Sequence, residues 1–226
     1  MRFYSQQNED QTIIKDIYKG KVPHNKKFIE LGAMDGIMYS NTKFFEDNCG
    51  WTGILIEPVK HLYDQLVRNR PNSDCFNYAI SETEGEVNYI GYHATSGMEH
   101  TMTIGHKSCW HKTQNKPYKV KSIPINKIVD KEKYLEIELF SVDVEGGEFE
   151  VLNTFDWDID VNMVLIEISE IGEDNSKYKK PYHDLEKDQK CRDILKEKGF
   201  VFVERIGAND LWQNKKYRKD EEDNIV

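Results

Sequence analysis

The stretch KFIELGAMDGIMYSNTKFFEDNCGWTGILIEP, residues 27–58, decides the fold class. Its residues 27–31 are mostly apolar, as in a buried strand, and a turn with two glycines follows them. The next segment has the spacing of a helix that carries Phe44 and Phe45, and residues 52–56 form a second apolar strand. The order strand, turn, helix, strand predicts one unit of a parallel sheet in an α/β protein.

The same alternation continues along most of the chain. Residues 164–166 form the continuous apolar run expected of a strand that is buried on both faces. Residues 93–119 have no regular period, and we expect a substrate loop or an insertion there. One domain is therefore predicted over residues 1–213, followed by a polar, mobile tail at 214–226. Further helices are expected around residues 13–18, 62–67, 148–155 and 187–198, and further strands at 75–78, 87–92, 138–143, 163–168, 200–204 and 208–213.

The composition limits the classes of function. The 226 residues include 40 Asp and Glu against 31 Lys and Arg, a net charge of -9, which disfavours nucleic acid as a partner. The chain has no apolar run that could span a membrane, and residues 1–20 lack the apolar region of a secretion signal. Its four cysteines lie far apart without a CxxC pair, which argues against a disulfide framework. We expect a folded cytoplasmic protein with reduced thiols, and the sequence predicts no oligomeric state.

The glycine turn at residues 32–36 lies where a doubly wound sheet binds its ligands, at the carboxyl end of a strand. Gly32 and Gly36 would let a ligand approach the backbone, and Glu57, at the end of the next strand, could bind the hydroxyls of a ribose. Asp35 would repel a pyrophosphate, which favours S-adenosylmethionine, with its ammonium and sulfonium, over a dinucleotide. The alternative interpretation is that the two glycines only shape a tight turn.

Several segments together resemble the FkbM family of S-adenosylmethionine-dependent methyltransferases. They are YSQQNED at residues 4–10, FIELGAMDGIMYSNT at 28–42, GWTGILIEP at 50–58, AIS at 79–81 and SVDVEGGEFEVL at 141–152. The resemblance implies a single-domain, Rossmann-like class I methyltransferase fold, with a mostly parallel seven-stranded sheet and helices on both faces. It also implies methyl transfer, usually to oxygen, and often a sugar or glycan hydroxyl as the small-molecule acceptor.

The resemblance also assigns residues to the cofactor. Glu57 would bind its ribose, residues 77–81 would line its adenine, and the N-terminal signature would pack over its pocket. For that signature, and for Ser40 and Asn41, helix capping is an equally good interpretation. The residues assigned to cofactor binding are Gln6, Asp10, Glu30, Gly32, Ala33, Gly36, Asn41, Glu57, Pro58, Ala79, Ile80 and Asp143.

Asp143 and Glu145 follow another predicted strand and should face the same crevice as the methyl donor. Both are catalytic candidates, and Asp143 is the first choice for the base that takes the proton of the acceptor, or for the group that orients it. Glu148 is assigned to the start of the next helix. The alternative for Asp143 and Glu145 is that they cap that helix. If Glu167 or Glu170 converges on them, these acids could also hold a divalent metal, Mg²⁺ or Ca²⁺.

The irregular segment is rich in histidine. His93 and His100 are the candidates for a catalytic or substrate-binding histidine. The spacing of the histidines and Cys109 matches no familiar zinc pattern. Trp110 and Tyr92 could stack on a sugar or pack in the core.

A run of lysines in this segment keeps a second function open. Lys107, Lys112, Lys116, Lys119 and Lys121 have no acid among them and could meet a phosphate-bearing acceptor, although a solvated loop would look the same. The alternative function is therefore an RNA or nucleotide O-methyltransferase. A non-catalytic binding protein on the same fold and a dinucleotide oxidoreductase are further alternatives.

Overall fold

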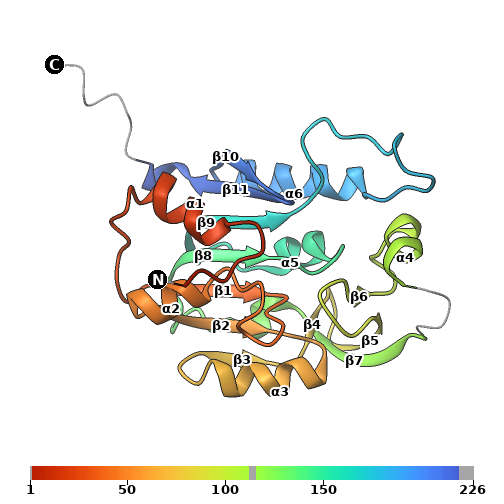
Figure 1. The fold of residues 1–226 in the computed structure, drawn as a ribbon, viewed down its shortest axis with the longest axis horizontal. Coiled ribbons are helices and arrows are strands. Elements are labelled where there is room, and N and C mark those ends of the chain that lie inside the picture. Colours follow the sequence, from red (N-terminus) through yellow and green to blue (C-terminus); the bar gives the residue numbers. More distant parts are fainter. Residues whose placement is uncertain (1, 112–115, 219–226) are drawn as a thin grey trace.

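The computed structural model describes residues 2–111 and 116–218, and its centre is a sheet of seven strands (Figure 1). In chain order these strands are β1 (Lys27–Leu31), β2 (Thr52–Ile56), β3 (Asp74–Phe76), β8 (Glu136–Val142), β9 (Asp160–Glu167), β10 (Phe200–Ile206) and β11 (Asn209–Asn214). They lie side by side in the order β10, β11, β9, β8, β1, β2, β3. The five strands from β9 to β3 run parallel, while β11 is antiparallel to both β9 and β10. The expected α/β architecture with a mostly parallel seven-stranded sheet is confirmed.

Helices cover both faces of this sheet. One face packs against α1 (Glu9–Thr12), the π-helical turn η1 (Ile13–Ile17), α2 (Lys43–Cys49) and α3 (Lys60–Asn69), and the other against α5 (Glu148–Thr154) and α6 (Leu185–Glu197). Along β1, Phe28 packs with Phe45 on the first face, and Ile29 packs with Val151 on the second. This two-sided burial explains the apolar character of the central strands β1, β2, β8 and β9, because most of their residues are buried on both faces of the sheet.

The segment that was expected to be irregular contributes to a second, smaller sheet. Its strands are β4 (Ala79–Ile80), β5 (Gly85–Ile90), β6 (Gly97–Met98) and β7 (Tyr118–Ile123), in the order β4, β7, β5, β6. The helix α4 (Ile104–Trp110) follows β6 in the chain. Residues 93–119, where a substrate loop or an insertion was expected, contain β6, α4 and the start of β7 in their described part. In Figure 1 the second sheet and α4 lie at one end of the large sheet, where they can wall a site.

The element boundaries follow the predictions to different degrees. The strands predicted at residues 27–31 and 52–56 have those bounds, whereas the strand expected at 75–78 is β3. The tail begins with a 3-10 turn, η3 (Lys215–Tyr217), and another, η2 (Ile125–Lys127), precedes β8. The Tyr217 hydroxyl donates to Asp160 Oδ2 at 2.7 Å, so the first part of the predicted tail is packed. Residues 219–226 of that tail lie outside the described part of the chain.

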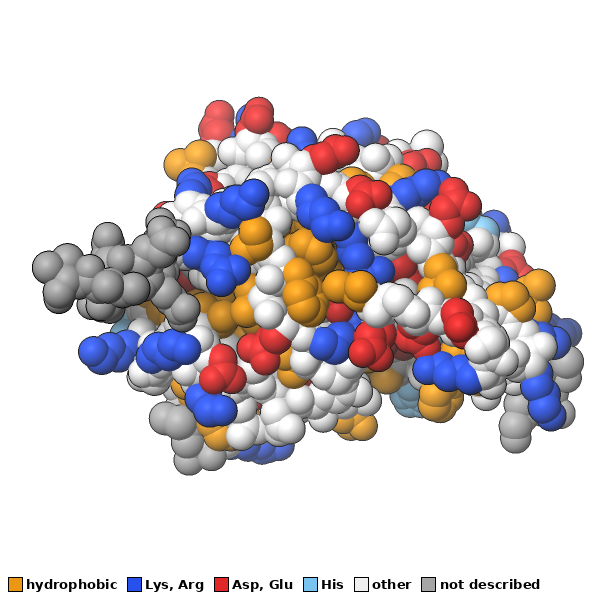
Figure 2. All heavy atoms as spheres, turned by 90° about the horizontal axis from the view of Figure 1, so that it is seen from above, with side chains coloured by type: hydrophobic (Ala, Val, Ile, Leu, Met, Phe, Trp, Pro, Cys, Tyr) orange, Lys and Arg blue, Asp and Glu red, His pale blue; other side chains and the backbone are white. Residues whose placement is uncertain are grey.

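The side of the molecule formed by β10, β11 and α6 carries a shallow apolar groove. Phe200, Phe202 and Trp212 line it, beside Lys196 and Lys215. Figure 2 looks onto this side and shows hydrophobic side chains near its centre with Lys and Arg side chains beside them. None of the described helices is both long enough and apolar enough to cross a bilayer.

Candidate active site

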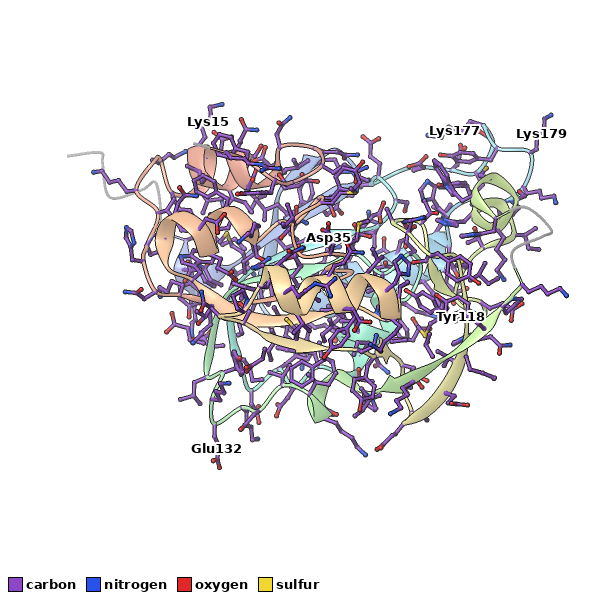
Figure 3. All side chains as sticks on the ribbon, turned by 60° about the horizontal axis from the view of Figure 1, so that its bottom comes forward. Lys15, Asp35, Tyr118, Glu132, Lys177 and Lys179 are labelled. Atoms are coloured by element: carbon purple, nitrogen blue, oxygen red, sulfur yellow. The ribbon has the colours of Figure 1, made fainter. Side chains whose placement is uncertain are left out.

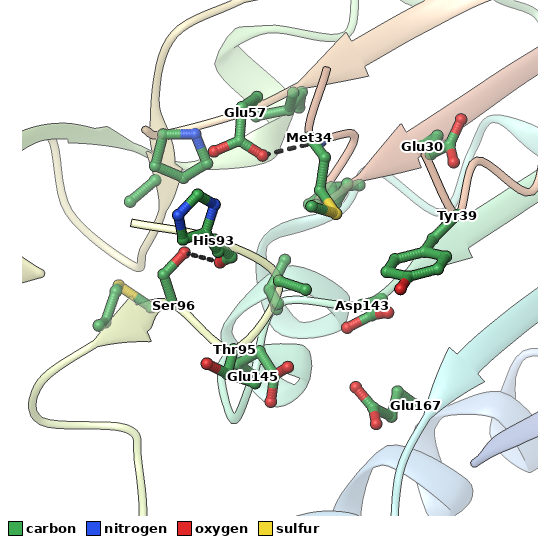
Figure 4. Close-up of a pocket in the computed structure, with 18 of the residues that line it drawn as sticks. Glu30, Met34, Tyr39, Glu57, His93, Thr95, Ser96, Asp143, Glu145 and Glu167 are labelled. Carbon is green, nitrogen blue, oxygen red and sulfur yellow. Dashed lines mark hydrogen bonds between the residues drawn. The ribbon is translucent and has the colours of Figure 1, made fainter. Parts of the chain in front are cut away.

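A cavity of about 210 Å³ opens at the carboxyl ends of β1, β2, β8 and β9 (Figure 4). The second sheet and residues 93–96 form its opposite wall. Parallel strands place their carboxyl ends along one edge, which is why residues far apart in the sequence meet here. Of the residues assigned from the sequence, the cavity brings together Gln6, Glu30, Gly32, Asn41, Glu57, Pro58, Ala79, Ile80, His93, Asp143 and Glu145.

Glu57 ends β2 and is fixed by two backbone amides. Its Oε2 accepts from Met34 N at 2.9 Å, as Figure 4 shows, and its Oε1 accepts from Val59 N at 2.7 Å. Burial raises the pKa of Glu57 to about 7. Each carboxylate oxygen has a second acceptor position, so Glu57 can still bind two neighbouring hydroxyls of a ligand.

Glu30 lines the cavity, but its carboxylate oxygens bind the chain itself. Oε1 accepts from Asn41 N at 2.8 Å, and Oε2 accepts from the Ser40 hydroxyl at 2.9 Å and from the Thr42 hydroxyl. Burial raises the pKa of Glu30, and the nearby Arg70 guanidinium opposes that rise. Glu30 therefore anchors the loop at residues 32–42 and also lines the cavity, and its assignment to the cofactor stays a prediction.

The two glycines of this loop serve packing inside the protein. Gly32 has φ +72°, and a Cβ there would lie 2.0 Å from the carbonyl oxygen of Asp143. Gly36 has φ +80°, and a Cβ there would lie 2.7 Å from side-chain atoms of Arg70 and Leu66. Gly36 is absent from the lining of the cavity, as is Ala33, which packs in the core beneath the loop. Of these three expected cofactor contacts, only Gly32 lines the cavity.

Asn41 is buried in the cavity wall, and only the nitrogen of its side-chain amide has a hydrogen-bond partner among the described residues. Its Nδ2 donates to Ser141 Oγ at 3.0 Å. Its Oδ1 is buried without a hydrogen-bond partner in the described part of the chain. A buried acceptor left in this way is costly, so a ligand that brings a donor would satisfy it.

Only part of the N-terminal signature, residues 4–10, lines the cavity. Gln6 lines the cavity, and Ser5 forms a β-bridge with Tyr39 that holds this segment against the loop at residues 32–42. Asp10 does not line the cavity. Its carboxylate accepts from Tyr4 N at 2.9 Å and from the Ser5 hydroxyl at 2.6 Å. Asp10 therefore holds residues 4 and 5 from outside the cavity lining, and its position does not support the expected cofactor contact. The N-cap position of α1 is Asn8, whose side chain makes no capping hydrogen bond.

Three carboxylates meet at the ends of β8 and β9. One oxygen atom each from Asp143, Glu145 and Glu167 lies within 4.8 Å of the others, while Glu170 lies outside this group. Burial raises the pKa of all three acids. Glu167, whose pKa lies well above its usual range, opposes the rise that burial causes in the pKa of Asp143. Asp143 lines the cavity beside these two acids.

The residues around this acidic group settle the capping alternative. Helix α5 has Gly147 at its N-cap position, so neither Asp143 nor Glu145 caps it. Glu148 begins α5, as expected, and its Oε1 accepts from Val144 N at 3.1 Å and from Gly146 N at 3.2 Å. Burial raises the pKa of Glu148 to about 8. Glu145 has φ 58°, an uncommon conformation for a residue with a side chain, which points its carboxylate at the cavity.

The histidines of the segment take different places. His93 lines the cavity, whereas His100 is exposed outside it, so the expected role of His100 is not supported by its position. His106, another histidine of the segment that was ranked below His93 and His100, lies with Nδ1 3.5 Å from Glu145 Oε2, and burial lowers its pKa to about 4. Among the described residues, the histidines and Cys109 form no group of three metal ligands.

An aromatic pair closes the cavity at the acidic end. Trp110 Nε1 donates to the Tyr182 hydroxyl at 2.8 Å, and both side chains line the cavity. Tyr92 instead stacks on Tyr118, with ring centroids 5.0 Å apart. Sequence reasoning missed Tyr182 because the segment between β9 and α6 has no periodic pattern. The only available signal was its aromatic type.

The lysine run lies outside the cavity. Lys107 belongs to α4, and Lys116, Lys119 and Lys121 are exposed on or next to β7. Lys112 lies outside the described residues. Among the residues that the structure describes, no Lys or Arg lines the cavity. A phosphate-bearing ligand would find no cation there.

The chemistry of the lining fits a cationic cofactor. Its acidic side chains are Glu30, Glu57, Asp143, Glu145 and Glu167, and no described Lys or Arg lines it. S-adenosylmethionine carries a sulfonium and an ammonium, whereas the pyrophosphate of a dinucleotide would be repelled. The ammonium would also supply the donor that Asn41 Oδ1 lacks. The cavity therefore fits S-adenosylmethionine better than a dinucleotide.

A comparison with protein-family models gives the family of the chain. The family model described as methyltransferase FkbM domain matches residues 30–202. No curated protein matches the chain closely enough to count as a relative.

Solved structures with a similar fold include three methyltransferases. A TehB-like S-adenosylmethionine-dependent methyltransferase from Corynebacterium glutamicum is 8% identical, over 95% of this chain and 89% of that one, with a TM-score of 0.44. Methyltransferase FkbM from Methylobacillus flagellatus is 12% identical, over 93% of this chain and 48% of that one, with a TM-score of 0.45. Fibrillarin from Aeropyrum pernix, with natively bound S-adenosylmethionine, is 11% identical, over 92% of this chain and 75% of that one, with a TM-score of 0.40. This chain thus spans about half the length of the FkbM structure.

Proposed function

The chain belongs to the FkbM methyltransferase family and is an S-adenosylmethionine-dependent methyltransferase, and from this premise we propose that it methylates a hydroxyl oxygen of a sugar or glycan. The observation that carries the proposal is the acidic end of the cavity, where the Asp143 carboxylate and the aromatic pair Trp110 and Tyr182 line the same space. A hydroxyl needs a base, and a sugar ring has an apolar face that stacks on aromatic side chains.

The proposed roles of the residues follow from their contacts. When bound, S-adenosylmethionine supplies an electrophilic methyl group on a sulfonium. Glu57 would hold the ribose hydroxyls, and Asn41 Oδ1 would accept from the ammonium. Asp143 would accept the acceptor's proton while the new carbon–oxygen bond forms and the carbon–sulfur bond breaks. Proton transfer of this kind contributes about 10²- to 10⁴-fold, and holding the acceptor in line contributes the rest.

The charges of the lining favour an uncharged acceptor over a phosphorylated one. An RNA or nucleotide acceptor would bring its phosphates to a cavity whose described charged groups are all acids. The four described lysines that kept that alternative open lie on α4 and on or next to β7. We therefore favour a neutral polyhydroxyl compound, acting in the cytoplasm as the sequence predicts.

Calorimetric titration with S-adenosylhomocysteine tests the cofactor site, with NAD as the comparison ligand. We expect micromolar binding of S-adenosylhomocysteine only, and a loss of at least about tenfold in the Glu57→Ala variant. Binding of NAD alone, or of neither ligand, would contradict the proposal, and the latter would favour a non-catalytic protein.

A panel of acceptors then tests the oxygen chemistry. Neutral sugars and glycans are incubated beside their phosphorylated forms and a short RNA, and methylated products are detected by mass spectrometry. A mass gain of one methyl group on neutral sugars supports the proposal. Products formed only from the phosphorylated compounds or RNA would establish the alternative function.

A further inference from the structure

Arg70, the residue that ends α3, is completely buried behind the loop at residues 32–42. Its Nη1 donates to the carbonyl oxygen of Gly36 at 3.2 Å and to Ser40 Oγ at 3.1 Å. Its Nη2 donates to Thr42 Oγ1 at 3.0 Å. The Arg70 guanidinium thus donates hydrogen bonds to three residues of the loop. Two of them, Ser40 and Thr42, also bind Glu30.

The same side chain balances the charge of two acids. Arg70 Nε donates to Glu46 Oε2 at 2.7 Å, and Nη1 lies 3.8 Å from Glu30 Oε2. All three side chains are less than a tenth exposed, so water does not screen their charges. A single cation therefore holds an acid of α2 and the acid that anchors the loop in one network.

The loop is shaped to receive this arginine. Gly36 leaves the space through which the Arg70 side chain passes, since a Cβ there would lie 2.7 Å from Arg70 Cγ. The neighbouring Asn69 donates through Nδ2 to the carbonyl oxygen of Asp35 at 2.8 Å. Figure 3 shows Asp35 beside the helix α3. The end of α3 and the turn therefore fit one another over two successive residues.

We propose that Arg70 is a positioning residue for cofactor binding, which fixes the loop so that Asn41 keeps its place in the cavity wall. This inference rests on the proposed function and adds a residue that does not line the cavity. The link is direct: Arg70 binds Ser40 and Thr42, both bind Glu30, and Glu30 binds the amide of Asn41. Lysine cannot replace arginine here, because one ammonium cannot donate along the three directions of a planar guanidinium.

Two matched variants separate positioning from plain stability. Arg70→Lys keeps the positive charge and removes the planar guanidinium. Arg192→Lys makes the same change in another buried arginine, which does not line the cavity and whose Nη2 lies 3.1 Å from Asp210 Oδ2. Both should lower the melting temperature. We expect only Arg70→Lys to weaken S-adenosylhomocysteine binding, by at least about tenfold in calorimetry. Equal affinities of the two variants would overturn the proposal.

A second measurement keeps the test decisive. The backbone N–H of Asn41 donates to Glu30 Oε1, so its hydrogen-exchange rate measures how firmly the loop is held when no ligand is bound. It should be faster in Arg70→Lys than in Arg192→Lys, and unchanged exchange would overturn the proposal. If wild-type protein binds no S-adenosylhomocysteine, the proposed function fails, while exchange still decides whether Arg70 holds the loop.

Should Arg70→Lys fail to fold, Ser40→Ala removes one contact of the guanidinium and one of Glu30. It should reduce the affinity for S-adenosylhomocysteine several-fold and speed exchange at Asn41. Wild-type affinity and wild-type exchange in this variant would again overturn the proposal.

Discussion

Asp143 lines the cavity beside Glu167 and is our candidate for the base. Burial raises the pKa of Asp143, and Glu167 opposes that rise. Asparagine has the same shape but cannot take up the proton. We predict that Asp143→Asn lowers kcat by about 10²- to 10⁴-fold and leaves the affinity for S-adenosylhomocysteine nearly unchanged. Single-turnover rates and calorimetry measure the two effects.

Glu167→Gln is the control for this change, because glutamine can donate a hydrogen bond to Asp143. Its kcat should fall far less than that of Asp143→Asn. If Asp143→Asn instead weakens cofactor binding and leaves kcat intact, Asp143 is a binding residue and another group is the base.

Buried acids also determine how stability depends on pH. The pKa values of Glu57 and Glu148 rise from 4.5 to about 7 and about 8, so the folded state keeps protons that the unfolded state releases. Stability should therefore be highest near pH 5 and fall as the pH rises toward 8, by up to about 1.4 kcal/mol per pH unit for each group while it titrates. Urea unfolding across this range measures the slope. Glu148→Gln should flatten it between pH 5 and 8, and an unchanged slope would contradict this origin.

At the scale of elements, the sequence predicts best where an apolar run is bounded by turns. The strands at residues 27–31 and 52–56 have this form and were found with the right ends. In the second sheet, β5 overlaps the strand expected at residues 87–92, whereas β4, β6 and β7 were not predicted, and β4 and β6 are only two residues long. Two residues carry no period, so such strands are defined only by their partners.

The residues of the site were also predicted only where the sequence around them has a local pattern. Glu57, Asp143 and Glu145 were found because strand ends bind ligands in parallel sheets. Tyr182 and Arg70 were missed because tertiary packing brings them in from segments without a local signal. The loop glycines were recognised, but their neighbours are protein atoms, which sequence spacing does not reveal.

Gly32 joins β1 to the loop where β8 ends, and its replacement should damage the fold itself. Its Cβ would lie 2.0 Å from the Asp143 carbonyl oxygen, and its φ is +72°. Gly20 has a similar φ of +79° with nothing within 4 Å, so Gly20→Ala isolates the backbone penalty. We predict a loss of about 1 kcal/mol for Gly20→Ala and several kcal/mol more for Gly32→Ala. Equal losses in chemical unfolding would show that β8 can move away.

At the scale of the whole molecule, the cavity and the chain have the same sign of charge. The chain carries a net charge of -9, and the described charged groups of the cavity are acids. The sequence predicted the overall charge, but only the fold could show that the local lysine run stays outside the cavity. The electrostatic field should therefore attract a cationic cofactor and repel a phosphorylated acceptor.

This field makes the affinity for the cofactor depend on salt in a way that the affinity for the product does not. S-adenosylmethionine has a net positive charge, whereas S-adenosylhomocysteine, without the sulfonium, has none. Added salt screens the acids, so raising NaCl from about 50 mM to about 500 mM should weaken binding of S-adenosylmethionine several-fold and of S-adenosylhomocysteine by less than about twofold. Calorimetry of both ligands in both buffers measures the difference. Equal salt dependence would mean that the acids are neutralised, by protons or by a bound cation, before the cofactor arrives.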